Sequence, residues 1–176
     1  AFLGISRLST ALETRGRGGY AVRYTVHALI LPLLSMANDA PTAAIHRLFD
    51  AINAQDIPRA VDQLHADYRG VDATRSVVTT SRAEAEREIR AGLTAFPDLT
   101  LSVEQCVVES PRVSVFWGLD ATHGGSFLDI PPTQQSISVS GTGLFTVRDE
   151  RIVRAVHLWD LAGFLRAIRL LPNLPQ

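Results

Sequence analysis

The first half of the chain places apolar residues at the spacing of amphipathic helices. From Pro41 onward they recur three or four positions apart, which predicts a first helix that ends at residues 53–56. A second, short helix follows with Pro58 in its first turn, where proline is favoured. Ser81 and Glu84 form a capping-box pattern, which predicts a third helix that ends before Pro97. The predicted apolar faces are Ile45, Leu48, Phe49 and Ile52, then Ile57, Ala60, Val61 and Leu64, then Ala85, Ile89, Leu93 and Phe96.

The second half changes to the composition of β-strands. Four stretches rich in valine, isoleucine, threonine and aromatic residues are separated by turn residues, and a short extended segment ahead of them ends near Asp72. Helices followed by antiparallel strands favour an α+β domain with helices on one face of a curved sheet, which tends to enclose a pocket. The four predicted strands cover residues 99–108, 112–122, 136–147 and 151–159.

Residues 1–35 differ from the rest of the chain. They hold four arginines against the single acid Glu13, and basic residues ahead of a short apolar run over residues 28–34 resemble a secretory signal or transit peptide. That run is too short to span a bilayer. We expect residues 1–36 to be an N-terminal extension, a leader or an upstream stretch of reading frame, and residues 37–176 to form the domain. The expected location is cytoplasmic, with export through the leader as the alternative.

The composition of the chain limits the kinds of ligand or partner that it is expected to bind. A chain of 176 residues with 46% hydrophobic residues fits one domain with a sizeable core. Its formal charge of -1 provides no basic surface for nucleic acid. The single cysteine, Cys106, excludes an intramolecular disulfide and a cysteine-cluster zinc site, and no His/Asp/Glu spacing predicts a metal site. We therefore expect a small-molecule ligand and no metal.

The first candidate for chemistry is Asp160, which follows the last predicted strand. A carboxylate beside Trp159 and ahead of Phe164 would be partly desolvated, and desolvation raises a carboxyl pKa and suits the group to proton transfer. The alternative is that Asp160 caps the N-terminus of a terminal helix, a role that aspartate fills well. The residues alone favour capping over catalysis.

Four segments of the chain carry a further signal through their order and spacing. They are Phe96-Pro97-Asp98-Leu99, Thr122-His123-Gly124-Gly125-Ser126-Phe127, Ile130-Pro131-Pro132-Thr133, and Arg151-Ile152-Val153 followed by Trp159-Asp160 and Gly163-Phe164-Leu165. Together they resemble the SnoaL-like polyketide cyclases of the nuclear-transport-factor-2-like superfamily, over about residues 41–170. The resemblance implies three N-terminal helices packed on a highly bent antiparallel sheet, which form a cone around a deep pocket.

The resemblance also implies an activity. Asp160 matches the family's aspartate after the last strand, which acts as the general acid/base of a cofactor-free intramolecular aldol closure. His123 would then be a hydrogen-bond donor or acceptor in the pocket, or would instead hold the following loop. The implied function is a cofactor-independent cyclase or isomerase acting on a small apolar or polyketide-like ligand. No cofactor is expected.

Further residues are predicted to bind this ligand. The two tryptophans offer flat apolar walls, although buried aromatics are commonly plain core. His157 ranks below His123, because strand alternation places His157 and Asp160 on opposite faces. Asp72 lies where related isomerase-like folds place a base, and a solvated loop carboxylate is its other interpretation. The predicted ligand-binding set is Trp117, Trp159, His157, Asp72 and Phe96.

Two other functions remain open at the level of sequence. One is a protein that binds an apolar ligand without turnover, and the other is an epoxide hydrolase on the same fold. The hydrolase would need an Asp-Arg-Asp arrangement, which the sequence alone does not assign. The family commonly forms dimers, and the strand over residues 112–121 is apolar on both faces, so we expect a homodimer that buries part of the outer sheet.

The chain departs from the family pattern in its loops. Asp129 and Gln134 stand where glycines are usual, and Asp149-Glu150 replaces the common Asp-Gly of the final hairpin. The segment Ala167-Ile168-Arg169 replaces the usual Gln-Leu-Gly ending. These changes keep the fold and bear on the loop geometry, and hence on the substrate.

Overall fold

The computed structural model describes residues 41–172. The predicted leader, Met36 and the predicted boundary between residues 36 and 37 lie outside this part of the chain. Within it, no helix is long and apolar enough to cross a membrane.

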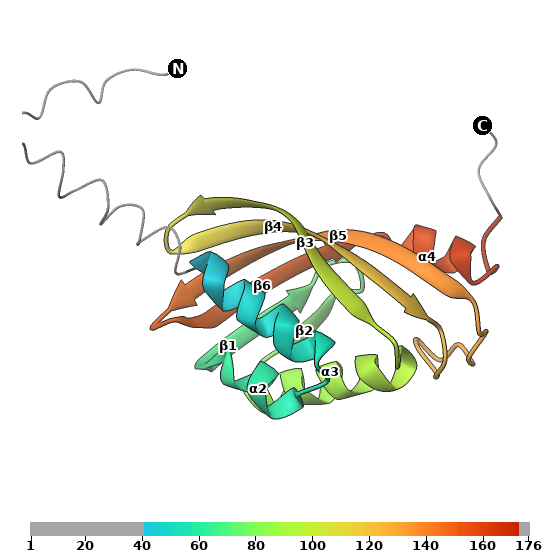
Figure 1. The fold of residues 1–176 in the computed structure, drawn as a ribbon, viewed down its shortest axis with the longest axis horizontal. Helices are drawn as coiled ribbons and strands as arrows, with labels where there is room; N and C mark the ends of the chain where they lie inside the picture. The colour runs from blue at the N-terminus through green and yellow to red at the C-terminus, as the bar shows by residue number, and fades with distance from the viewer. Residues whose placement is uncertain (1–40, 173–176) are drawn as a thin grey trace, which may run out of the picture. The chain divides into compact units, whose positions relative to one another are not determined.

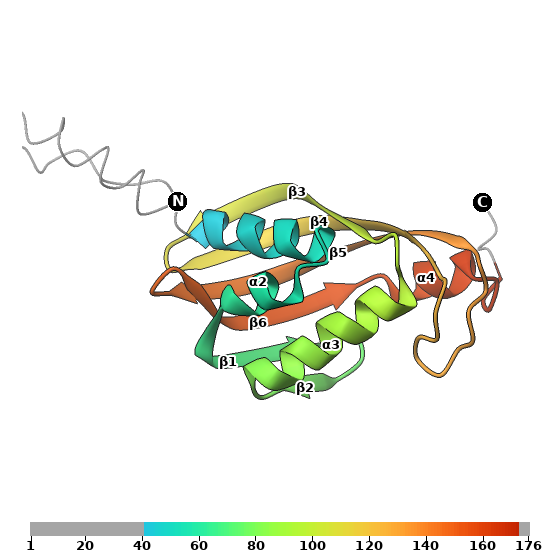
Figure 2. The ribbon, with the colours of Figure 1, turned by 60° about the horizontal axis from the view of Figure 1, so that its bottom comes forward.

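Three helices lie on one side of a curved sheet (Figures 1 and 2). The first occupies residues 41–53, and α2 (Ile57–Asp62) and α3 (Arg82–Ala95) follow it. Ser81 caps α3 by accepting a 3.2 Å hydrogen bond from the Glu84 amide, as predicted. The Glu84 carboxylate bonds the amide of Thr80 at 2.6 Å, one residue before the cap, so the predicted capping box is displaced by one residue.

The sheet has six strands in the order β2-β1-β6-β5-β4-β3. All four predicted strands are confirmed, with ends that agree within one residue, which supports the α+β class read from the sequence. Figure 2 shows the strands running side by side behind the helices. The strands are β1 (Leu64–Asp72), β2 (Val77–Thr79), β3 (Thr100–Glu109), β4 (Arg112–Thr122), β5 (Ser136–Arg148) and β6 (Arg151–Trp159).

The strand β1 differs from the sequence prediction. The segment was expected to be short, with Leu64 in the second helix, yet β1 runs for 9 residues and pairs in parallel with β6. The short strand β2 was not predicted. The pairing of β1 with β6 is interrupted by a register shift between Leu64 and Arg69. This shift breaks the regular alternation of apolar and polar residues by which a long strand is recognised.

The inner face of β5 is hollowed by two glycines. A Cβ atom on Gly141 would collide with the ring of Trp117, and one on Gly143 would collide with the ring of Phe145. Each ring thus occupies space that a side chain on the glycine would need. The missing side chains leave room between the sheet and the helices, because neighbouring inward positions such as Val139 are filled.

The last helix, α4 (Leu161–Ala167), lies at the end of the sheet opposite the β5–β6 turn (Figure 1). Asp160 is its N-cap and accepts a 2.7 Å hydrogen bond from the Gly163 amide. Phe164, on the first turn of α4, is 1% exposed and packs in the core. The helix therefore closes one end of the space beneath the sheet.

Candidate active site

Two cavities lie between the helices and the inner face of the sheet, and Trp117 lines both. The first, here called the helix-side cavity, has a volume of about 200 Å³ and is bordered by Tyr68, Glu88 and His157. The second, the aromatic cavity, has a volume of about 170 Å³. Its lining includes Asp72, Arg75, Phe96, Phe127, Trp159 and Phe164.

Asp72, at the end of β1, is the one carboxylate that lines the aromatic cavity. Its side chain is 14% exposed and accepts hydrogen bonds from the Trp159 indole at 3.0 Å and from the Arg75 guanidinium at 2.5 Å. Burial by itself raises the pKa of Asp72, but these hydrogen bonds and the charge of Arg75 outweigh it and lower the pKa below its ordinary value. Asp72 is therefore ionised at neutral pH.

His157 occupies the register position on β6 that pairs with Asp72 on β1. The two side chains share the inner face of the sheet, because paired residues on neighbouring strands point to the same side. Burial lowers the pKa of His157, and the charge of Asp72 partly opposes that effect. His157 is therefore a neutral imidazole beside an anion, and its ring packs edge-on against Phe145 with centroids 5.4 Å apart.

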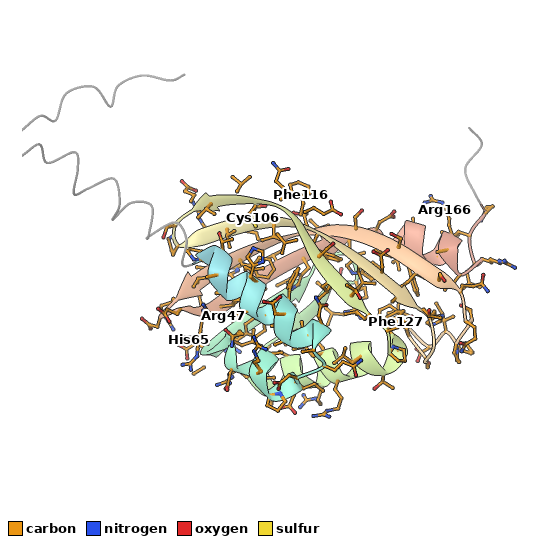
Figure 3. The ribbon with its side chains drawn as sticks, viewed as in Figure 1. Arg47, His65, Cys106, Phe116, Phe127 and Arg166 are labelled. Carbon is orange, nitrogen blue, oxygen red and sulfur yellow. The ribbon has the colours of Figure 1, made fainter. Side chains whose placement is uncertain are left out.

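Arg75, in the turn after β1, and Phe127 also border the aromatic cavity. The guanidinium carbon of Arg75 lies 5.8 Å from the centroid of the Phe127 ring, which is within cation–π range. Figure 3 shows Phe127 beside the C-terminal end of α3, in the connection between β4 and β5. The arginine thus links the carboxylate of Asp72 to an aromatic wall.

The structure brings five of the seven predicted site residues together. Trp117, Trp159, Asp72 and Phe96 line the aromatic cavity, and His157 lines the adjoining one. The solvated-loop interpretation of Asp72 is wrong, because its carboxylate is largely buried and fully engaged in hydrogen bonds.

Asp160 is placed elsewhere. It is exposed, it caps α4, and it lines neither cavity. The expected partial desolvation of this carboxylate is therefore wrong, because the chain leaves the sheet after Trp159 and Asp160 is exposed at the start of α4. The capping interpretation is confirmed, whereas its catalytic role stays a prediction that the placement does not favour.

His123 lies behind the wall of the aromatic cavity. It is fully buried, and its ring centroid is 5.7 Å from those of Phe96 and Phe164, both of which line that cavity. Its Nδ1 lies 3.0 Å from the hydroxyl of Thr133, while its Nε2 has no hydrogen-bond partner within the described part of the chain. Burial lowers its pKa. The alternative role, holding the loop that follows β4, agrees with this geometry.

The sequence reasoning missed Arg75, Phe127, Tyr68 and Glu88. Arg75 had a usable signal, since a basic residue three positions after Asp72 can pair with it across a turn. A second signal was the pair of glycines at alternate positions of one strand, which marks a close approach by other side chains. Among residues 41–172, no cluster of three or more His, Cys, Asp or Glu side chains has metal-binding geometry.

The fold and site define a class: an α+β domain with apolar cavities between a bent sheet and its covering helices, and a carboxylate–imidazole pair on the inner face. Residues 42–168 match the SnoaL-like polyketide cyclase family, and the chain belongs to this family. This confirms the resemblance read from the sequence. No curated protein matches the chain.

Solved structures share the fold. A proposed SnoaL-like polyketide cyclase from Jannaschia sp. CCS1 is 25% identical, with a TM-score of 0.70 over 77% of this chain and 96% of that one. AclR, a proposed hydroxylase from Streptomyces galilaeus, is 24% identical, with a TM-score of 0.71 over 79% and 91%. IdmH, a proposed polyketide cyclase from Streptomyces antibioticus, is 21% identical, with a TM-score of 0.65 over 73% and 97%.

Proposed function

We propose that this protein is a cofactor-independent cyclase or isomerase that moves a proton next to a carbonyl group, with His157 as the base. The observation that carries the proposal is the pairing of Asp72 and His157 at one register position of β1 and β6. Asp72 lines the aromatic cavity and His157 lines the helix-side cavity, and Trp117 borders both cavities. A proton-transfer group thus lies next to an apolar binding space.

The directions of the two pKa shifts support different roles for Asp72 and His157. Asp72 is a weak base, because Arg75 and Trp159 stabilise its ionised form. His157 is neutral and free to accept a proton, and the imidazolium that forms is stabilised by the negative charge of Asp72. The aspartate of the proposed mechanism is therefore Asp72, as an electrostatic partner, and His157 performs the transfer.

The aromatic cavity suits a planar, largely apolar substrate. Trp117, Trp159 and three phenylalanines supply flat walls, and polar contacts are confined to Asp72 and Arg75. Such walls fit the aromatic or polyketide-like compounds that the family name suggests. Neither cavity alone is large, so a substrate of several rings would extend past Trp117 from one cavity into the other.

The two alternatives make different demands on the site. An epoxide hydrolase of the Asp-Arg-Asp type needs a second aspartate across Arg75, and the lining of the aromatic cavity contains no second carboxylate. A binding protein without turnover needs only the apolar walls. It would tolerate substitution of His157, and the experiment below separates it from an enzyme.

The test is exchange of a carbon-bound proton for solvent deuterium in simple aromatic ketones, 1-tetralone and 2-acetonaphthone. Mass spectrometry of each ketone in deuterium oxide measures the rate with the purified protein. We expect His157→Gln to lower this rate by about 10² to 10⁴-fold, the usual contribution of a general base. Asp120→Asn, an exposed carboxylate on β4, is the matched control and should leave the rate unchanged.

Binding is measured separately through tryptophan fluorescence. The chain has two tryptophans, and both Trp117 and Trp159 line the aromatic cavity, so quenching reports occupancy of the site itself. Quenching by the ketones without deuterium exchange would overturn the enzymatic proposal and support a binding protein. Equal exchange by the parent and His157→Gln would overturn the role of His157.

A further inference from the structure

Tyr68 is a polar residue of the site that the proposed proton transfer does not yet use. It lies on the inner face of β1, is 7% exposed, and borders the helix-side cavity together with His157. Among residues 41–172 the Tyr68 hydroxyl has no hydrogen-bond partner, although buried tyrosine hydroxyls usually have one. A donor that faces a cavity without a protein partner is available to a ligand.

The direction of the Tyr68 side chain is fixed by a glycine. A Cβ atom on Gly70 would lie 2.7 Å from the Tyr68 hydroxyl, so the phenol leans along β1 over Gly70. Gly70 pairs with Ala155 on β6, two residues before the pair of Asp72 and His157. At about 3.3 Å per strand residue, the hydroxyl lies roughly 7 Å along the sheet from that pair. This interval accommodates a carbonyl group and its neighbouring carbon between the two side chains.

The phenol keeps its proton throughout the working pH range. Burial, and secondly the negative charge of Glu88, raise the pKa of Tyr68 to about 12. Oε1 of Glu88 itself accepts a 2.7 Å hydrogen bond from the Thr79 hydroxyl, which ties the carboxylate to β2. Tyr68 therefore presents a neutral O–H donor towards the cavity.

We propose that the Tyr68 hydroxyl is a catalytic residue that donates a hydrogen bond to the substrate carbonyl oxygen and to the enolate that replaces it. The inference rests on the proposed function, in which the carbon–hydrogen bond breaks and its proton passes to His157. The electron pair of that bond moves into the new carbon–carbon double bond, and the negative charge develops on the oxygen that Tyr68 contacts. A fixed donor at this oxygen stabilises the transition state more than the ground state.

The enolate then completes the reaction without a further reagent. Its carbon attacks a second carbonyl carbon of the same molecule and forms the ring bond. The proton on His157 returns to the alkoxide oxygen produced by that attack. The residues thus restore their starting protonation states, and no electron is gained or lost.

The experiment uses an enolate mimic and its uncharged counterpart. At pH 8, 4-nitro-1-naphthol is an aromatic oxyanion, and 1-nitronaphthalene has the same ring system without the oxygen. Both affinities are measured by calorimetry on the full chain, for the parent, Tyr68→Phe and Gly70→Ala. We expect Tyr68→Phe to weaken naphtholate binding by about 10 to 100-fold, the usual effect of losing one hydrogen bond to a charged group, with nitronaphthalene affinity unchanged.

Gly70→Ala keeps the phenol and displaces it, so it should weaken naphtholate binding selectively as well. Circular dichroism and the melting temperature identify any variant that has lost the fold. An equal loss for both ligands would show that Tyr68 only packs, and unchanged naphtholate affinity in Tyr68→Phe would show that it does not donate. Either result overturns the proposal.

Deuterium exchange separates this inference from the function on which it rests. If Tyr68 is the donor, Tyr68→Phe lowers the turnover number for exchange of 1-tetralone and changes KM little. Loss of exchange in His157→Gln together with a fully active Tyr68→Phe would reject Tyr68 and keep the function. Selective naphtholate binding that depends on Tyr68, with exchange indifferent to His157, would keep the donor and reject the function.

Discussion

The indole Nε1 of Trp159 donates a 3.0 Å hydrogen bond to Oδ2 of Asp72, a residue on a strand far away in the sequence. The strand β6 thus supplies both the imidazole and the donor that holds the carboxylate. Asp160, the next residue along the chain, points to solvent and caps α4. The aspartate that serves the site is therefore on β1, although the neighbour of Trp159 in sequence suggested otherwise.

Removing this hydrogen bond should change the titration of Asp72. In Trp159→Phe we expect the pKa of Asp72 to rise towards its ordinary value of 3.8, because one donor to the ionised form is lost. Carboxyl carbon NMR measures it. Trp117→Phe is the matched control, since Trp117 lines the same cavity and does not bond Asp72. An equal rise in both variants would contradict the prediction.

The same bond should appear in the pH dependence of stability. The pKa of Asp72 is lower in the folded chain than in the unfolded one, so its stabilising contribution is present above the unfolded pKa and is lost as pH falls through the folded pKa. Trp159→Phe should therefore have a lower free energy of unfolding than the parent at neutral pH, in part because Asp72 loses this hydrogen bond. That part of the difference should shrink as the pH falls and Asp72 becomes protonated. Urea unfolding at several pH values measures this difference.

The protonation of His157 should determine how the rate of deuterium exchange falls at acidic pH. The base must be neutral, so the rate should rise with pH and level off above the pKa of His157, which burial lowers from 6.5. The charge of Asp72 raises the pKa of His157. In Asp72→Asn, the pH range in which the remaining exchange activity rises should therefore move to lower pH. A displacement of this range to higher pH would contradict the assignment.

Asp160→Asn tests the role predicted by the family resemblance. We expect a nearly neutral effect on rate and stability, because the side chain is exposed and asparagine caps a helix about as well as aspartate. Asp160→Ala should cost about 1 kcal/mol of unfolding free energy through loss of the cap. A fall in rate of about 10² to 10⁴-fold in Asp160→Asn, with the fold intact, would restore Asp160 as the acid/base group.

Glycine in the turn between β5 and β6 should increase the stability of the protein. Asp149 and Glu150 have φ angles of 49° and 58°, left-handed values that a two-residue hairpin turn requires at both positions. Glu150→Gly should therefore stabilise the protein by about 1 kcal/mol, because glycine adopts this conformation without steric cost. Thermal unfolding measures the gain. Glu150→Ala is the control and should show none, since alanine keeps the Cβ atom.

The homodimer remains a prediction, for which the outer face of the sheet provides a test. Phe116, Leu144 and Leu158 are 48%, 47% and 53% exposed on neighbouring strands, and Figure 3 shows Phe116 on the side away from the helices. Phe116→Glu should dissociate a dimer formed through this face. Leu170→Glu, an equally exposed apolar residue after α4, should not. A monomer mass for the parent at every concentration in sedimentation would contradict the dimer.

Local physical chemistry explains why much of the fold could be read from the sequence. The cap at Ser81, the end of α3 before Pro97 and the four long strands depend on interactions between residues close in the chain, and their signals agree with the structure. The expectation that alternation places His157 and Asp160 on opposite faces stays untested, because β6 ends at Trp159 and Asp160 is already the N-cap of α4. The order and spacing of the four motifs identified the family, which the match over residues 42–168 confirms.

The partnership of strands was decided by tertiary structure alone. Alternation determines which residues of β6 face inward, but it does not say which strand lies beside them, and β1 carries an irregular pattern because of its register shift. Only the pairing of β1 with β6 brings Asp72 to His157 and Trp159, and only the packing of helices over the sheet buries the pair. The sequence by itself thus determined the helices, the four long strands and the family, whereas long-range pairing and burial, which have no local signature, decided the extent of β1 and which carboxylate enters the site.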